Sequence, residues 1–420
     1  MEYWTSLRTR TATVQTSFSD SSVVLHREPP VESTKFTVFR DFFSAGRKYT
    51  GRAEVLVTTP CNGIPTQRQL EEASIAAENV ADPWYPVKLL QHPSLPSKTS
   101  TFSKQELEDW VHPIQEVLSA ACAGEAYQLL SEHVLLSREE CRFRDSSGRD
   151  MSDVRYRGYL EVSLLPVDQP ESHPVQGELH FSEFSPSLFR SFMGEQGRLT
   201  LGSSLAQVWV PPKQEFLVLL RGSAVRLIFN YLLRQLCGSA LYKGDSQLVR
   251  GEPLWAVQSH ADQVTMSALP LLYDSPCTSL FDDEGVVLKK HNLVTEGTVE
   301  GFLADQRTSH WLGLPLTGIN QNFSVSPGSA DFQQVAGSTV LEVHSLRMAD
   351  IEDSTGDFVA VVELADFYST QSKLPVTGFA LRGNLRTVLS EARFSSDIGS
   401  WENFEGPEFL LVPSPLVLGG

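Results

Sequence analysis

Along the N-terminal part of the chain, β-branched and aromatic residues recur with the short period that is typical of strands. Polar segments that contain Pro or Gly, at Arg27–Ser33 and Ser44–Gly51, predict turns between these strands. The strands predicted from this pattern are Thr11–Glu28, Lys35–Phe43 and Gly51–Thr59, followed later by Glu132–Leu136 and Tyr156–Val167.

Two other stretches have apolar residues at helical spacing, and each begins with a capping box. In this motif an N-cap hydroxyl and a Glu or Gln three residues later satisfy backbone N–H groups that have no partner within the helix. Thr66 and Gln69 form the first box, and Ser103 and Glu106 form the second. We expect Pro113 to kink the second helix, because proline removes one backbone hydrogen bond.

The connection between the two helices, Asp82–Ser100, contains four prolines, which predict an extended segment. Strands before and after a pair of helices favour an α/β sandwich, in which amphipathic helices cover one sheet. We therefore expect residues 1–210 to form an N-terminal α/β domain.

The segment Val208–Gln214 contains two prolines and is the predicted joint between two domains. A strand at Glu215–Leu220 and a helix at Ala224–Cys237 follow it. Ser223 is the expected N-cap of this helix, and Gly238 is the expected left-handed residue that ends it.

From Leu241 onward, short apolar runs alternate with Gly, Pro, Asn and Asp, and only Arg382–Ser390 has helical spacing. This pattern predicts a mostly antiparallel C-terminal β domain, strongly curved or barrel-like, over residues 211–420. The expected fold class of the whole chain is therefore α+β.

Composition agrees with a globular protein of two domains. The chain has 420 residues, of which 41% are hydrophobic and 20% are charged. No apolar run reaches the roughly 18 residues that a membrane-spanning helix requires. The five cysteines are scattered without a CxxC pair, which favours reduced thiols, and the N-terminus lacks the apolar core of a signal peptide. We therefore expect a cytoplasmic protein.

The formal charge of −17 makes nucleic acid and anionic membranes unfavourable partners, because both would be repelled at long range. An acidic surface could attract basic peptides, although the same charge also serves solubility.

The most specific motif pattern lies in Asp282–Gly318, which opens on an Asp-Asp-Glu-Gly turn. The turn itself predicts a charged bend with Gly at positive φ, since it lacks the alternating oxygen ligands of a calcium loop. The spaced residues that follow are Leu293, Gly297, Gly301-Phe302-Leu303, Asp305, Thr308, Leu312-Gly313-Leu314 and Thr317-Gly318.

These residues and spacings resemble the C-terminal domain of the TldD/PmbA peptidase family, and the resemblance extends from about Glu215 to the end of the chain. In its metallopeptidase members, the helix after the domain joint carries HExxxH. The two histidines of this motif bind zinc, its Glu acts as general base, and a late cysteine completes the ligand set.

The chain has no HExxxH, and its residues at the corresponding positions are of other types. When the chain is aligned on Gly238–Gly244, Phe229 takes the first ligand position, Asn230 the base position and Arg234 the second ligand position. Phe has no donor atom, an Asn amide cannot shuttle a proton, and Arg stays cationic. No cysteine follows Cys277. We therefore expect no metal, no other cofactor and no catalytic residue in this chain.

Apolar residues also run along one side of this helix, which is typical of a packed helix with Phe229 in the core. Asn230 and Arg234 lie on its polar side, where Arg234 could hold a peptide carboxylate or be an ordinary surface arginine. The histidines show no HxH, HxxxH or HExxH spacing.

The resemblance implies a metal-free subunit on the TldE/PmbA side of the family. Such a subunit pairs with a zinc-dependent TldD-like peptidase, and the heterodimer binds and processes unfolded or modified peptides, for example in leader-peptide removal. Two alternatives stay open, a stand-alone peptide-binding protein or chaperone and an enzyme with a repurposed active site.

An interface with a partner subunit should use apolar and aromatic side chains near sheet edges. The candidates are Trp311, Leu314, Trp401 and Phe404. The tryptophans are equally compatible with core positions in their own domain.

Overall fold

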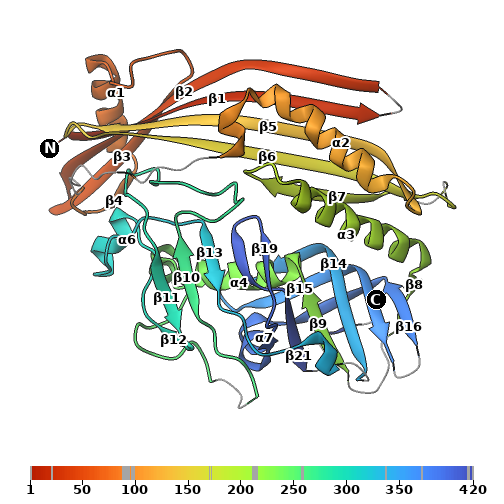
Figure 1. The fold of residues 1–420 in the computed structure, drawn as a ribbon. Coiled ribbons are helices and arrows are strands. Elements are labelled where there is room, and N and C mark those ends of the chain that lie inside the picture. The colour runs from red at the N-terminus through yellow and green to blue at the C-terminus, as the bar shows by residue number, and fades with distance from the viewer. Residues whose placement is uncertain are drawn as a thin grey trace.

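The protein is described by a computed structural model (Figure 1). The structure describes residues 2–19, 22–87, 95, 100–169, 171, 173–210, 216–256, 260–335, 338–369, 372–413 and 417–418. The predicted joint at Val208–Gln214 lies mostly outside the described residues, so the boundary at residue 210 stays a prediction.

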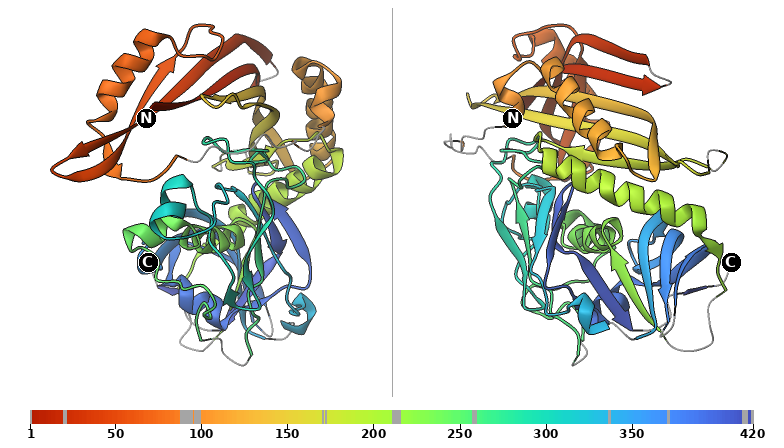
Figure 2. Two further views of the ribbon diagram at one scale, coloured as in Figure 1. Left: turned by 90° about the vertical axis from the view of Figure 1, so that its left-hand side faces the viewer. Right: turned by 45° about the vertical axis from the view of Figure 1, so that its right-hand side comes forward.

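An antiparallel sheet of seven strands, in the order β4-β3-β2-β1-β5-β6-β7, forms the N-terminal part. Figure 2 shows that this sheet curls like a half-barrel open towards the C-terminal part. The strands are β1 (Glu2–Ser19), β2 (Ser22–Ser44), β3 (Arg47–Val57), β4 (Ala81–Pro83), β5 (Tyr127–Asp145), β6 (Asp150–Pro166) and β7 (Val175–Phe181).

The turn predicted at Arg27–Ser33 is wrong, because β2 runs straight through Pro29 and Pro30. Two features let a strand accept prolines there. The pairing with β1 shifts register beside them, between Thr11 and Thr13, which is a β-bulge. In addition, β3 pairs with β2 only from Thr34 onward, so the missing N–H groups lie on an edge.

The first predicted helix is confirmed as α1 (Gln67–Ala77), with Thr66 as N-cap and the complete capping box to Gln69. The second helix begins later than predicted. Two 3-10 turns, η1 (Thr101–Lys104) and η2 (Leu107–Trp110), precede α2 (Val111–Cys122). Pro113 therefore lies in the first turn of α2, where its missing N–H would have no helical partner, and it has no hydrogen bond to break.

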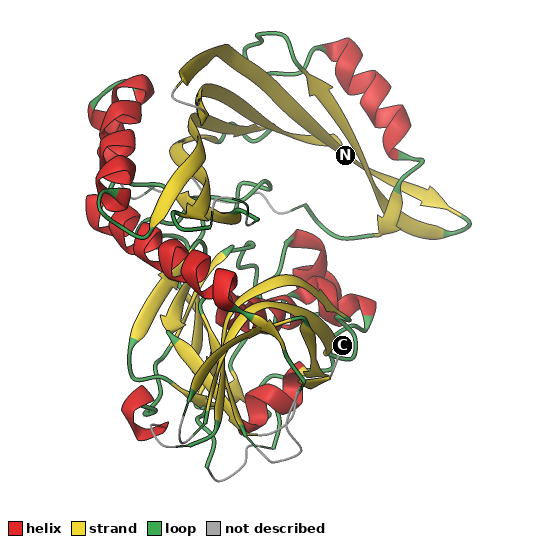
Figure 3. Ribbon diagram, turned by 90° about the vertical axis from the view of Figure 1, so that its right-hand side faces the viewer, coloured by secondary structure: helices red, strands yellow, loops and turns green. Residues whose placement is uncertain are grey.

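The longest helix, α3 (Pro186–Leu205), was not predicted, since its three glycines and its serines weaken the helical pattern. Gly197 is required by packing, because a Cβ there would meet the Tyr127 ring at 2.1 Å. Figure 3 shows α3 running between the N-terminal sheet and the C-terminal part. Of the segment expected to be extended, Asp82–Ser100, only the short strand β4, residues 84–87, 95 and 100 are described.

The C-terminal part consists of two sheets, a six-stranded one (β12-β11-β10-β13-β20-β19) and a nine-stranded one that also includes β8, β17 and β22. Three strand pairs, β13–β20, β9–β14 and β8–β16, are parallel, and the other pairs are antiparallel. The strands are β8 (Gln207–Val208), β9 (Leu217–Arg221), β10 (Met266–Leu269), β11 (His291–Thr295), β12 (Thr298–Val299), β13 (Asn322–Val325), β14 (Val340–Ile351), β15 (Asp357–Tyr368), β16 (Lys373–Thr377), β17 (Phe379–Asn384), β18 (Arg393–Phe394), β19 (Ile398–Trp401), β20 (Phe404–Pro407), β21 (Phe409–Pro413) and β22 (Val417–Leu418).

Helix α4 (Ser223–Gln235) lies among these sheets, and its buried apolar residues belong to the largest core cluster of the described residues. Its predicted termini were wrong. Gly222, with φ 57°, is the N-cap, and Gly238 begins a further helix, α5 (Gly238–Lys243), which Gly244 ends in the left-handed conformation. Two short helices complete the fold, α6 (Gln306–Trp311) and α7 (Leu385–Glu391), and the latter confirms the helix predicted around Arg382–Ser390.

The predicted α+β class is confirmed. Among the described residues, no helix is both long enough and apolar enough to span a membrane.

Candidate functional site

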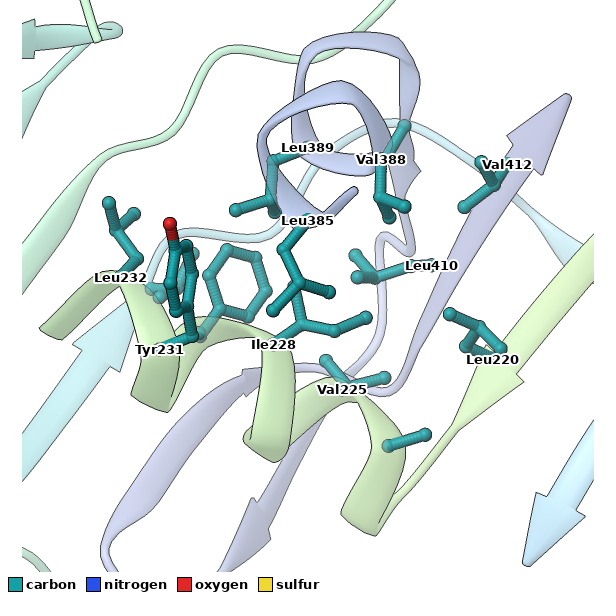
Figure 4. Close-up of a cluster of buried hydrophobic side chains, with 14 of the residues drawn as sticks. Leu220, Val225, Ile228, Tyr231, Leu232, Leu385, Val388, Leu389, Leu410 and Val412 are labelled. Atoms are coloured by element: carbon teal, nitrogen blue, oxygen red, sulfur yellow. The ribbon is translucent and has the colours of Figure 1, made fainter. Parts of the chain in front are cut away.

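Helix α4 is the element where the resemblance placed a catalytic centre. One side of it is apolar and packs on α7 and on strands β9 and β21, as Figure 4 shows for Val225 and Ile228. This packing follows from the 3.6-residue spacing seen in the sequence. Because the apolar side of α4 is packed in this way, only the side chains on its polar side can face the space between the N-terminal and C-terminal parts.

Phe229 is fully buried. Its ring centroid lies 5.5 Å from that of Phe394 and 5.7 Å from that of Phe404, so three aromatic rings pack against one another. A side chain without a donor atom, enclosed by other rings, cannot bind zinc. The predicted core position of Phe229 is therefore confirmed.

Arg234 is already paired. Its Nη2 donates to Asp353 Oδ1 at 2.7 Å and its Nε donates to the same oxygen at 3.1 Å, while Gln235 Nε2 donates to the Asp353 carbonyl at 2.7 Å. These bonds attach the end of α4 to the turn between β14 and β15. Asn230 is partly buried between the two arginines of the helix, Arg226 and Arg234.

The residues on α4 do not fit a zinc ion, since none of Phe229, Asn230 and Arg234 offers a suitable ligand atom. The hairpin of β19 and β20 supplies a charge pair beside this helix. Glu402 lies 3.0 Å from Arg226 Nη1, which also donates to Asn403 Oδ1 at 3.2 Å.

Charges from both parts of the protein meet around Cys277. Burial raises the pKa of the Cys277 thiol, Arg157 of β6 and Arg226 of α4 act to lower it, and Glu402 acts to raise it. A thiol with a raised pKa is mostly protonated at neutral pH and is a poor nucleophile. This group of side chains therefore supports binding through paired charges better than covalent chemistry.

A strap, residues 270–285, holds the C-terminal part against the N-terminal sheet. Asp274 Oδ1 accepts hydrogen bonds from the N–H groups of Ser182 and Glu183 at 3.0 and 2.9 Å. Arg155 donates to Ser279 Oγ at 2.6 Å. At the end of the strap, the almost fully buried Arg149 donates to the Gly285 carbonyl at 2.8 Å.

Two acidic side chains of the Asp-Asp-Glu-Gly turn lie in this contact. Burial raises the pKa of Asp282 to about 6 and that of Glu284 to about 7. Asp282 Oδ1 accepts from the N–H groups of Glu284 and Val286, as expected for a tight turn, and Gly285 has φ 73°. Glu284 Oε2 accepts from the Gln306 N–H at the start of α6 at 3.0 Å.

Trp311 lies at a second contact between the two parts. Its Nε1 donates to the Pro83 carbonyl of β4 at 3.0 Å, and its ring centroid lies 5.9 Å from that of Tyr85 and 4.5 Å from that of Tyr242. Arg307 adds an ion pair to Asp82 at 3.5 Å. The Asp282–Gly318 segment thus joins the two parts at both of its ends.

The other predicted interface residues have different positions. Phe404 is fully buried within the chain, so the interface prediction does not hold for it. Trp401 is partly buried and stacks on Phe404 with a centroid distance of 5.9 Å. Leu314 is also partly buried and packs against the main core.

No pattern in the sequence pointed to one further cluster, in which three possible metal ligands lie within 4.8 Å of one another: Glu342, His344 and Asp366. Glu342 pairs with Asp366 across β14 and β15, and His344 Nε2 lies 2.7 Å from Asp366 Oδ2 and 3.9 Å from Glu342 Oε2. Arg221 already pairs with Glu342, and Lys373 lies 2.9 Å from Asp366, so the two carboxylates are neutralised.

This cluster is separate from the α4 site. Its neighbours along β14, Leu341 and Val343, belong to the core cluster around α4. Because side chains alternate along a strand, Glu342 lies on the opposite face of the sheet.

Comparisons with known proteins agree with this fold. Residues 213–416 match the profile described as the PmbA/TldA metallopeptidase C-terminal domain. No curated protein matches the chain.

Solved structures with 13–15% sequence identity share the fold over almost the whole chain. TldE from Thermococcus kodakarensis has a TM-score of 0.77 and 15% identity, covering 100% of this chain and 97% of its own. A candidate modulator of a DNA gyrase from Thermotoga maritima has a TM-score of 0.76 and 15% identity, covering 98% of this chain and 95% of its own. The matched profile therefore places residues 213–416 with the PmbA/TldA metallopeptidase C-terminal domains, and the solved structures show that the whole chain has the fold of TldE.

Proposed function

We propose that the chain is a metal-free, TldE-like subunit that pairs in the cytoplasm with a zinc-dependent TldD-like peptidase. The heterodimer binds unfolded or modified peptides, and the partner's zinc carries out hydrolysis. The same hydrolysis would remove a leader peptide or a protecting group in a biosynthetic pathway.

The position of Phe229 carries the proposal. A zinc site needs about three protein ligands around one open position. Here the first ligand position is filled by a buried ring that packs against two others, and Arg234 at the second is bound to Asp353. Both former ligand positions are thus occupied by side chains with packed or paired partners. This favours a non-catalytic subunit that serves a partner over an enzyme with a weakened zinc site.

The chain's own contribution is to bind and orient a peptide. The polar side of α4, the β19–β20 hairpin and strand β6 present the charged side chains of Arg226, Glu402 and Arg157 around Cys277. Such groups can hold backbone or side-chain charges of a peptide without taking part in bond cleavage.

The proposal is tested by adding the purified chain to a purified homologue that carries HExxxH and measuring hydrolysis of unstructured peptides. We expect no activity from the chain alone, activity from the mixture, and loss of that activity with a zinc chelator. The two proteins should also elute together in size-exclusion chromatography.

The matched control is the same homologue with the Glu of its HExxxH changed to Gln, which should still bind the chain and yet be inactive. Hydrolysis by the isolated chain in the presence of chelator would contradict the proposal and favour a repurposed active site.

A further inference from the structure

A cavity of about 310 Å³ opens on the helix-bearing face of the N-terminal sheet, away from the α4 site. Its lining includes Val14 of β1 and Leu107 of η2, which both belong to the core cluster beneath α2. The volume is within the range of small ligand sites, which starts at roughly 300 Å³.

The cavity is bounded by two places where the N-terminal part departs from regular structure. One is the bulge of the β1–β2 pair beside Pro29 and Pro30. The other is the pair of 3-10 turns that replaces the expected start of α2. Breaks in regular secondary structure are expected at functional sites, and here a β-bulge and two 3-10 turns line the same cavity.

The charge of the lining favours a cationic group. Arg27 lies 3.4 Å from Glu108, and Arg138 lies 2.8 Å from Glu140, so both guanidinium groups are already paired. Glu28 and Glu106 also line the cavity, and neither has an ion-pair partner among the described residues.

Aromatic side chains complete the cavity. Phe102 and Tyr156 both line it, with their ring centroids 6.3 Å apart. Ring faces attract ammonium and guanidinium groups, and carboxylates beside them add to that attraction.

The outer edge of β2 runs past the same cavity. Because β3 pairs with β2 only from Thr34 onward, no described strand pairs with the outer edge of residues 22–33. This edge also exposes apolar side chains, since Val24 is 61% and Leu25 is 54% accessible. An unpaired edge with exposed apolar residues is a template for an added strand.

We propose that the β2 edge and this cavity bind an extended peptide segment that carries a basic residue. The segment pairs with residues 24–28 of β2 as an added strand, and its Lys or Arg side chain enters the cavity beside Glu28 and Glu106. This binding depends neither on zinc nor on a partner subunit.

A fluorescein-labelled peptide of alternating Val and Lys residues is the probe, and its binding to the full-length chain is measured by fluorescence polarisation. We expect saturable binding that weakens with added salt. The double variant Glu28→Gln/Glu106→Gln should bind about five- to tenfold more weakly, as expected for two partly exposed ion pairs. The matched variant Glu125→Gln, an exposed carboxylate outside the cavity, should bind like the wild type.

Hydrogen exchange locates the added strand, because amides of residues 24–28 should become protected when the peptide is present and stay unchanged with a Val/Glu peptide. The proposal is overturned if the Val/Glu peptide binds equally well, if the double variant binds like the wild type, or if protection appears only between the two parts of the protein.

Discussion

At the residue scale, α4 shows how side chains that offer no metal-ligand atom change what a helix can do. Phe229 and Arg234 are recognisable in the sequence as non-ligands, and the structure adds where each is held. The sequence could not reveal Asp353 as the partner of Arg234, because the two residues are far apart along the chain and no local pattern links them.

Replacing Phe229 by Ala should lower the free energy of unfolding by about 3–5 kcal/mol, the usual cost of a cavity left by a buried aromatic ring. The loss is expected because Phe394 and Phe404 both pack against it. Urea denaturation followed by tryptophan fluorescence measures the change. Ile75→Ala, at a side chain that is 68% exposed, should change stability by less than about 0.5 kcal/mol.

At the element scale, sequence reasoning succeeded where local contacts decide the structure. The Thr66–Gln69 capping box is one such case, since all its hydrogen bonds lie within four residues. The prediction that Gly238 ends the helix was wrong, because a contact with a residue far away in the sequence determines the structure there. A Cβ on Gly238 would lie 2.8 Å from Thr308, so this glycine serves close packing and not a helix end.

The strap supplies a prediction about pH. Because the pKa of Glu284 is raised to about 7 in the folded protein, its ionisation opposes folding. Stability from this group is fully present below its ordinary pKa near 4.5 and is lost as pH rises through 7. The full difference is on the order of 3 kcal/mol, at about 1.4 kcal/mol for each pKa unit.

Glu284→Gln should therefore be more stable than the wild type at pH 8 and equally stable at pH 4. Thermal unfolding at several pH values measures this, with Glu300→Gln, an exposed carboxylate, as the control. The physical reason is burial, to which the nearby Asp305 and Asp282 add, while Arg52 acts in the opposite direction. A variant that gains the same stability at pH 4 would show that ionisation of Glu284 is not the cause.

At the scale of the whole molecule, the most family-like segment of the sequence is also the segment that joins the two parts. Its strap end carries Gly285 and its far end carries Trp311, and both bond to the N-terminal part. The sequence identified this segment by its spacing of glycines and hydrophobic residues. It could not assign Trp311 to an internal contact, because an aromatic residue near a sheet edge suits an internal and an external interface equally.

Trp311→Ala provides the test of that assignment. The substitution removes the hydrogen bond to the Pro83 carbonyl and the ring contacts with Tyr85 and Tyr242, which come from both parts of the protein. We expect amides of β4 and α6 to exchange with solvent about ten- to a hundredfold faster in the isolated chain, since each 1.4 kcal/mol of lost contact energy is tenfold in opening. Strands β5 and β6 should exchange as in the wild type, because their packing against α2 and α3 is untouched. Tyr273→Ala, at a side chain that is 75% exposed, is the matched control and should leave both regions unchanged. If Trp311 instead serves only an external interface, the isolated variant will exchange like the wild type and will fail only in binding the partner subunit.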